Sequence, residues 1–248
     1  MEIILECKGV TKKFGEFTAL DNVSFSVPTR SIFGIAGPNG AGKTTLFNCI
    51  TCNPYRLSSG KIIFKGEEIQ KLNPWEIVHK GIARTFQIPV RFKGLSYFKT
   101  VLIGAIFGSL TTFKDVVLQY DKHRFDRKAH ETLEFVGLIN KKDTPTLHAS
   151  LYDLKRLMIA SALATEPKLL LLDEPVSGLT DHEIKAMWNL LIRINKELGI
   201  TIIIVEHIMR FLMNISDIVL ILNAGKVVRI GNPGEVAKDP EVIKCYLG

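Results

Sequence analysis

The most informative segment of the chain reads Gly37-Pro38-Asn39-Gly40-Ala41-Gly42-Lys43-Thr44, followed by Thr45. It fits the pattern G-x-x-x-x-G-K-[ST] at every fixed position. The apolar run Ile32–Ala36 before it is typical of a strand, and residues 44–50 after it are typical of a helix. Glycines let backbone N–H groups curl around phosphate oxygens while the positive end of the following helix points at them. Residues 37–45, here called the phosphate loop, are therefore predicted to bind a nucleotide.

Two side chains of the phosphate loop suit a nucleoside triphosphate bound with Mg²⁺. Lys43 is expected to neutralise the β- and γ-phosphates. Thr44 offers a hydroxyl, and Mg²⁺ prefers hard oxygen ligands shared between phosphates and a few protein groups. The alternative is that these residues form only a glycine-rich turn. Such a turn would not need a strand before it and a helix after it, so we favour the nucleotide site.

A second signal is the apolar run Leu169–Leu172, which ends in the carboxylates Asp173 and Glu174. Such a run is typical of a buried parallel strand whose carboxyl end faces a ligand crevice. Asp173 is the candidate Mg²⁺ partner, and Glu174 is the candidate general base that polarises an attacking water. Alone the pair would usually be a solvated strand end, so its weight comes from the phosphate loop.

Strand and helix patterns alternate along most of the chain. Strand-like runs occur at Ile3–Val10, Val23–Val27, Ser31–Ala36, Lys61–Phe64, Leu169–Leu172, Ile200–Val205, Ile218–Leu222 and Lys226–Ile230. Residues 181–198 have helical periodicity, with Asp181 as the expected N-cap and Gly199 after the end, and Asn73-Pro74 favours another helix start. Helical signals dominate about residues 88–163. We expect one domain, residues 1–248, with a mainly parallel sheet covered on both faces and an inserted helical lobe.

Together these motifs resemble those of ABC (ATP-binding cassette) transporter ATP-binding subunits over essentially the whole chain. Arg84-Thr85-Phe86-Gln87 resembles the family's Q-loop, and Glu206-His207 resembles its switch. The resemblance implies an α/β P-loop NTPase core with an antiparallel β subdomain and a helical subdomain. It also implies that Gln87 lies near Mg²⁺ and the attacking water, linking catalysis to the membrane partner, and that His207 contacts the γ-phosphate. Without the other motifs His207 would be an ordinary helix-start residue.

Two further segments carry weaker resemblances. Phe14 lies upstream of the phosphate loop where the family stacks an aromatic ring on adenine. As a lone aromatic it could equally belong to the core. The segment 177–181 resembles the D-loop that touches the other subunit, although Thr180 replaces the usual Asp or Asn.

The family's signature motif, usually L-S-G-G-Q or L-S-Y-G-Q, aligns with Ala149-Ser150-Leu151-Tyr152-Asp153, and among its characteristic residues only Ser150 is retained. In the family this motif binds the γ-phosphate of ATP held by the opposite subunit. Tyr152 stands where Gly permits close approach and is expected to crowd the phosphate. Asp153 is expected to add a negative charge near it. We therefore expect a competent phosphate loop in this chain and a weakened site completed for its partner.

Within the family, residues 81–87 and the carboxyl-terminal segment 239–248 resemble the uptake ATPases for branched-chain amino acids. Such ATPases imply transmembrane permease subunits, a second ATP-binding subunit in a homodimer or heterodimer, and indirectly a solute-binding protein. Lys99-Thr100 stands where that group usually has Glu-Asn. Urea, amides or another small solute therefore stay open as substrates.

Composition separates the remaining alternatives. The amino terminus lacks the basic start and the apolar run of about 7 to 15 residues of a signal peptide, so we expect a cytoplasmic protein, peripheral on the inner face of the membrane. The net charge of +7 comes from scattered Lys and Arg, which argues against a nucleic-acid partner. A soluble ABC ATPase acting on nucleic acid or ribosomes usually has two cassettes or a long coiled coil. An ATP-binding regulatory subunit with little turnover is the other alternative, suggested by Tyr152 and Asp153.

Overall fold

A six-stranded, mainly parallel sheet forms the centre of the protein. The computed structural model describes residues 2–109 and 121–247. The strand order is β10 (Lys226–Gly231), β9 (Ile218–Asn223), β3 (Ile32–Ala36), β8 (Thr201–Val205), β7 (Leu169–Asp173) and β6 (Ile82–Arg84). All neighbours pair in parallel except β10, which is antiparallel to β9. The carboxyl ends of β3, β6, β7 and β8 therefore meet at one edge of the sheet, where the candidate site lies.

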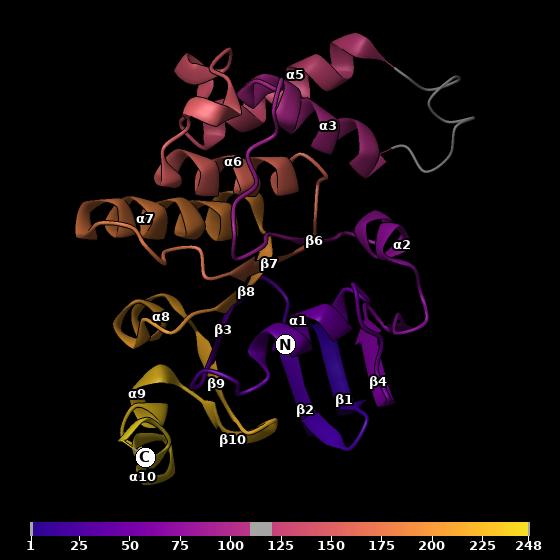
Figure 1. Ribbon diagram of the computed structural model, residues 1–248, viewed down its shortest axis with the longest axis vertical. Helices are drawn as coiled ribbons and strands as arrows, with labels where there is room; N and C mark the ends of the chain where they lie inside the picture. Colours follow the sequence, from indigo (N-terminus) through magenta and orange to yellow (C-terminus); the bar gives the residue numbers. More distant parts are fainter. Residues whose placement is uncertain (1, 110–120, 248) are drawn as a thin grey trace.

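A second, antiparallel sheet packs beside helix α1 (Lys43–Ile50) (Figure 1). Its order is β2 (Phe17–Pro28), β1 (Ile3–Phe14), β4 (Ser59–Phe64) and β5 (Glu67–Glu68). Leu46 and Phe47 of α1 are fully buried in one apolar cluster with Leu5 of β1 and Ile35 of β3. This cluster joins the antiparallel sheet to one face of the parallel sheet and fixes α1 between them. The expected α/β class, with an antiparallel β subdomain, is confirmed.

Helices gather at the opposite end of the molecule, above α7 in Figure 1. They are α3 (Tyr97–Ser109), α5 (Lys122–Phe135) and α6 (Leu151–Leu163), with short 3-10 turns at Ile139–Lys141 and Thr146–His148. A Cβ added at Gly104 of α3 would lie 2.4 Å from the carbonyl oxygen of Ser161 in α6, so these two helices approach closely only because residue 104 is glycine. Residues 88–96, expected to be the start of the helical lobe, are irregular apart from turns and a bridge; part of that lobe, residues 110–120, lies outside the described residues.

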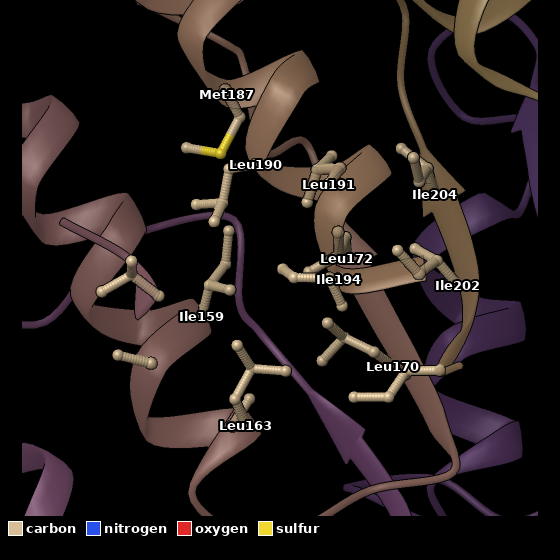
Figure 2. Packing of buried hydrophobic residues seen from close by; sticks show 14 of the residues in the cluster. Ile159, Leu163, Leu170, Leu172, Met187, Leu190, Leu191, Ile194, Ile202 and Ile204 are labelled. Carbon is tan, nitrogen blue, oxygen red and sulfur yellow. The ribbon is translucent and has the colours of Figure 1, made fainter. Parts of the chain in front are cut away.

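Helix α7 (Asp181–Leu198) covers the other face of the parallel sheet. Figure 2 shows its buried residues packed against side chains of β7, β8 and α6. The labelled residues are Ile159, Leu163, Leu170, Leu172, Met187, Leu190, Leu191, Ile194, Ile202 and Ile204. Because β7 and β8 are buried on both faces, their sequences are continuous apolar runs rather than alternating ones.

The helix boundaries follow capping chemistry. The predicted N-cap Asp181 is wrong by one residue: Thr180 is the N-cap, and its hydroxyl and the carboxylate of Glu183 form a capping box. That capping role accounts for threonine at position 180. Gly199 ends the helix in the left-handed conformation, with φ 65°. Asn73 caps α2 (Pro74–His79) as expected.

The short elements complete the fold. Strands β5 and β6 were not predicted, because two or three residues carry no detectable periodicity. After β8 come α8 (Met209–Ile215), α9 (Pro233–Val236) and α10 (Pro240–Leu247). Within the described ranges no helix has the length and apolar character needed to cross a membrane.

Candidate functional site

The phosphate loop connects β3 to α1 through a backbone that only glycine allows at its start. Gly37 has φ 152°, and a Cβ there would lie 2.0 Å from the carbonyl oxygen of Leu222 in β9. The Lys43 side chain folds back over the loop, where its Nζ donates to the carbonyl oxygens of Gly37 at 2.6 Å and Pro38 at 2.9 Å. In this conformation the Lys43 side chain therefore bridges the start of the loop to its end.

Lys43 is buried close to two acidic residues. Burial lowers the pKa of Lys43, and the charges of Glu174 and Asp173 act in the opposite direction. The ammonium group, the loop backbone and the two carboxylates therefore share one corner of the molecule. This is the arrangement that binds a phosphate chain with a cation.

Asp173, the last residue of β7, is held by an ion pair. Its Oδ2 accepts from Nη2 of Arg84 at 3.0 Å, and the two side chains are 2% and 6% exposed. Burial raises the pKa of Asp173, while the hydrogen bond and charge of Arg84 act against that rise. Its Oδ1 is buried and has no hydrogen-bond partner among the described residues.

Glu174 turns out of the strand and faces two other candidate residues. It adopts a left-handed backbone conformation, φ 49°, which is unusual for a residue with a side chain. Its Oε2 accepts from Nε2 of Gln87 at 2.9 Å. Its Oε1 lies 3.6 Å from Nδ1 of His207. The tertiary fold thus brings Gln87, Glu174 and His207 together from three strand ends.

A cavity of about 320 Å³ lies between α1 and the segment that contains Gln87. It is lined by Thr44, Asn48, Asn53, Pro54, Arg84, Phe86, Gln87, Ile88 and Asp173. Thr44 supplies a hydroxyl to this cavity, and Asp173 supplies a carboxylate with one unpartnered oxygen. Hard oxygen donors of this kind fit Mg²⁺.

His207 lies beside a second, buried carboxylate, with its Nδ1 3.9 Å from Oε2 of Glu206. Glu206 is fully buried and accepts from the backbone N–H of Val176 at 2.9 Å and of His207 at 3.2 Å. Burial raises the pKa of Glu206. His207 itself is 48% exposed, so its ring is accessible at the edge of the site.

Two residues near the site were missed by the sequence analysis. Lys155 of α6 is 3% exposed, and its Nζ donates to the backbone carbonyl of Glu174 at 2.6 Å. Arg84 was noted only as part of the Q-loop segment. Neither could be found from spacing, because a single basic residue in a helix or before a Gln has no pattern of its own.

Phe14 lies at the end of β1 and is partly exposed. Its ring meets Tyr55 edge-on, with centroids 4.8 Å apart, and Nζ of Lys12 lies 4.8 Å from the Phe14 centroid. The Phe14 side chain is 39% exposed, and its contact with adenine stays a prediction.

The signature segment differs from the sequence expectation in one respect. Ser150 is the N-cap of α6, and its Oγ accepts from the backbone N–H of Asp153 at 3.1 Å. The expectation that Asp153 presents negative charge to a phosphate is wrong. Its side chain points inward, 4% exposed, and binds Nζ of Lys141 at 2.7 Å and Nη2 of Arg156 at 2.5 Å. The ring of Tyr152 lies 4.1 Å from the Arg156 guanidinium.

Comparison with known proteins agrees with this geometry. The profile described as ABC transporter matches residues 20–177. The chain is 35% identical to the "High-affinity branched-chain amino acid transport ATP-binding protein BraF" of Pseudomonas aeruginosa, covering 99% of this chain and 98% of that protein. It is 32% identical to the "High-affinity branched-chain amino acid transport ATP-binding protein LivG" of Escherichia coli K12, with the coverage again 99% and 98%.

Solved structures show the same architecture. A nucleotide-free ATP-binding cassette from an ABC transporter superposes with a TM-score of 0.89 at 31% identity, covering 100% of both chains. A dimeric bacterial ABC transporter cassette superposes with a TM-score of 0.80 at 25% identity, covering 93% of this chain and 99% of that one. A related structure of that cassette, described as post-hydrolysis, holds ADP and Pi.

Proposed function

The chain belongs to the ABC transporter family, and on that basis we propose that it is the Mg²⁺-dependent ATP-hydrolysing subunit of an importer for branched-chain amino acids. The observation that carries the proposal is the meeting of Gln87, Glu174 and His207 beside the phosphate loop. These residues follow the ends of three different strands, so their proximity is a property of the folded site.

The phosphate loop binds the nucleotide in this proposal. Residues 37–45 surround the phosphates with backbone N–H groups, and Lys43 turns its ammonium group from the carbonyls of Gly37 and Pro38 to the β- and γ-phosphates. Thr44 and Asp173 would hold Mg²⁺, which when bound neutralises phosphate charge. The ring of Phe14 offers a stacking face for adenine.

Glu174 acts as the general base in the proposed hydrolysis. Gln87 donates to one carboxylate oxygen and His207 lies beside the other, so the two residues orient Glu174 for a proton of the attacking water. In this proposal His207 would also contact the γ-phosphate. A shift of the Q-loop would alter the contact between Gln87 and Glu174, which offers a route from the membrane partner to catalysis.

We place the membrane partner on the apolar surface beside the Q-loop. Phe86, Ile88 and Val90 are exposed by 51%, 77% and 55%, and they line a groove of about 270 Å³ that runs toward α3 and α6. Exposed apolar residues gathered in this way mark protein contact sites. The chain would then sit at the cytoplasmic face of the membrane, bound to permease subunits and indirectly served by a solute-binding protein.

A second ATP-binding subunit completes each site in the proposed assembly, because ATP in this family is sandwiched between two chains. Ser150 would face the partner's γ-phosphate. Tyr152 makes a less open surface there than glycine does. A heterodimer with one strong and one weak site fits this chain better than a symmetric pair.

The solute assignment follows the names of relatives at 32% to 35% identity. Lys99, where the sequence departs from that group, is exposed on α3, while Thr100 is buried in the same helix. Urea, amides or another small solute therefore remain the alternative.

The test is ATPase activity of the purified chain and of Lys43→Ala, each alone and with the permease subunits. Lys61→Ala is the matched control, because Lys61 is a surface residue of β4 that pairs with Glu68. We expect activity in the wild-type complex and in the control, and its loss in Lys43→Ala. ATP binding without turnover, both alone and with the permease subunits, would instead support a regulatory subunit. The altered residues of the signature segment are the reason for considering that alternative. Retarded migration of DNA or RNA would favour the nucleic-acid alternative.

A further inference from the structure

The Arg84 side chain contacts three other parts of the site. It is the last residue of β6 and its side chain is 6% exposed. Nη2 donates to Oδ2 of Asp173 at 3.0 Å, and Nη1 donates to Oδ1 of Asn48 in α1 at 2.7 Å. The guanidinium also lies 5.4 Å from the ring of Phe47 and 5.3 Å from the ring of Phe86. One planar cation thus contacts β7, α1 and the Q-loop.

The contact with Asn48 bears on Thr44. The two residues are one turn apart in α1, so their side chains lie on the same face of the helix. Both line the cavity that Asp173 also lines. By bonding Asn48 and Asp173 at once, Arg84 sets the position of the α1 face relative to the end of β7. It therefore sets the separation between the Thr44 hydroxyl and the Asp173 carboxylate.

The contact with Asp173 leaves one carboxylate oxygen for a ligand. Arg84 binds Oδ2, whereas Oδ1 is buried and unpartnered in the part of the chain that the structure describes. A buried carboxylate oxygen without a partner is costly. A cation in the adjoining cavity would satisfy it. Arg84 does not satisfy it, because its hydrogen bond to Asp173 goes to Oδ2, and Nε of Arg84 is likewise buried without a partner among the described residues.

We propose that Arg84 is the positioning residue of the Mg²⁺ site, holding the Asp173 carboxylate in register with Thr44 and tying both to the Q-loop through its stacking on Phe86. The proposal rests on the function proposed above. Arg84 does not ligate the metal in this scheme; it fixes the residues that do. Lysine cannot replace it fully, because a single ammonium cannot hold a carboxylate and an amide with the geometry of a guanidinium fork.

The experiment measures nucleotide affinity with and without the metal. A fluorescent ATP analogue is titrated with the full-length chain in EDTA and then across a range of Mg²⁺ concentrations, for wild type, Arg84→Gln, Arg84→Lys and Asn48→Ala. Residues that orient metal ligands typically change metal affinity by about 10-fold to 100-fold when removed. We expect Arg84→Gln to raise the Mg²⁺ midpoint by that amount, with smaller increases for the other two variants. Affinity in EDTA should stay within about twofold for all of them.

Arg193→Lys serves as the matched control, because Arg193 forms an Arg–carboxylate pair with Glu197 on the exposed surface of α7. Thermal melting establishes that each variant is folded at the assay temperature. If Arg84→Gln does not fold, Arg84→Lys and Asn48→Ala decide the question, since each keeps part of the network.

An unchanged Mg²⁺ midpoint in the folded variants overturns the proposal. An equal loss of affinity with and without Mg²⁺ also overturns it, because Arg84 would then support the phosphate loop in general. If the wild-type chain gains no affinity from Mg²⁺, the proposed function is at fault rather than the role of Arg84.

Discussion

Replacing Asp153 with Asn is expected to lower the free energy of unfolding by about 2 to 3 kcal/mol at neutral pH. Asn keeps the shape of the side chain but removes the charge that pairs with Lys141 and Arg156 at 2.7 Å and 2.5 Å. Breaking a buried ion pair by removing one partner costs about 3 to 5 kcal/mol. The expected loss is smaller, because Lys141 is 54% exposed and Arg156 also bonds two backbone carbonyls at 3.3 Å.

The same substitution has a defined pH dependence. Burial would by itself raise the pKa of Asp153, but hydrogen bonds and charges from Lys141 and Arg156 outweigh it and hold the pKa below the ordinary value of 3.8. A carboxylate with a lowered folded-state pKa stabilises the protein above the unfolded pKa and loses that contribution as pH falls through the folded one. The difference between wild type and Asp153→Asn should therefore be full at neutral pH and shrink below 3.8.

Urea denaturation followed by circular dichroism, at neutral pH and in acidic buffers in which both proteins still fold, measures this difference. Asp143→Asn is the control, because Asp143 is exposed and its loss should cost no more than about 0.5 kcal/mol. The conclusion that Asp153 forms a buried ion pair would be refuted by a difference in free energy of unfolding below that level between wild type and Asp153→Asn. A difference that grows as the pH falls would refute it too. Either result would also restore the view that Asp153 acts on a neighbouring phosphate.

The remaining predictions concern turnover. Glu174→Gln should keep ATP affinity while hydrolysis falls by at least about 100-fold, because the base is lost and the phosphate contacts remain; phosphate release and nucleotide binding measure the two effects, and full turnover would remove Glu174 from its role. Tyr152→Gly should raise the ATPase rate of the assembled complex, because it opens the surface offered to the partner's phosphate. An unchanged rate there would mean that Tyr152 does not limit the partner site. Asp153 is left intact in this variant, since changing it would confound stability with catalysis.

Much of the fold was accessible from local patterns. The phosphate-loop motif at Gly37–Thr44 predicts the strand before it and the helix after it. The apolar runs of β7 and β8 indicate strands that are buried on both faces. The helix at residues 181–198 was predictable from its apolar period and from Gly199. The predicted N-cap was wrong by one residue because Thr180 and Asp181 are both favourable N-cap residues. The capping box that Thr180 forms with the Glu183 side chain selects between them. The strand β6 was not predictable, since its three residues are held by pairing with β7.

For the site, the sequence alone indicated the candidate residues: the phosphate loop, Asp173 and Glu174 are recognisable because each motif is local and contiguous. Tertiary structure decided how they meet. Gln87 and Glu174 are 87 positions apart and join only through the register of the parallel sheet. The direction of the Asp153 side chain was likewise invisible in the sequence, because it depends on Lys141 and Arg156 reaching the same buried point. A one-dimensional pattern records residue types and spacing, whereas the pairing of charges depends on which side chains the folded chain brings within a few ångströms of one another.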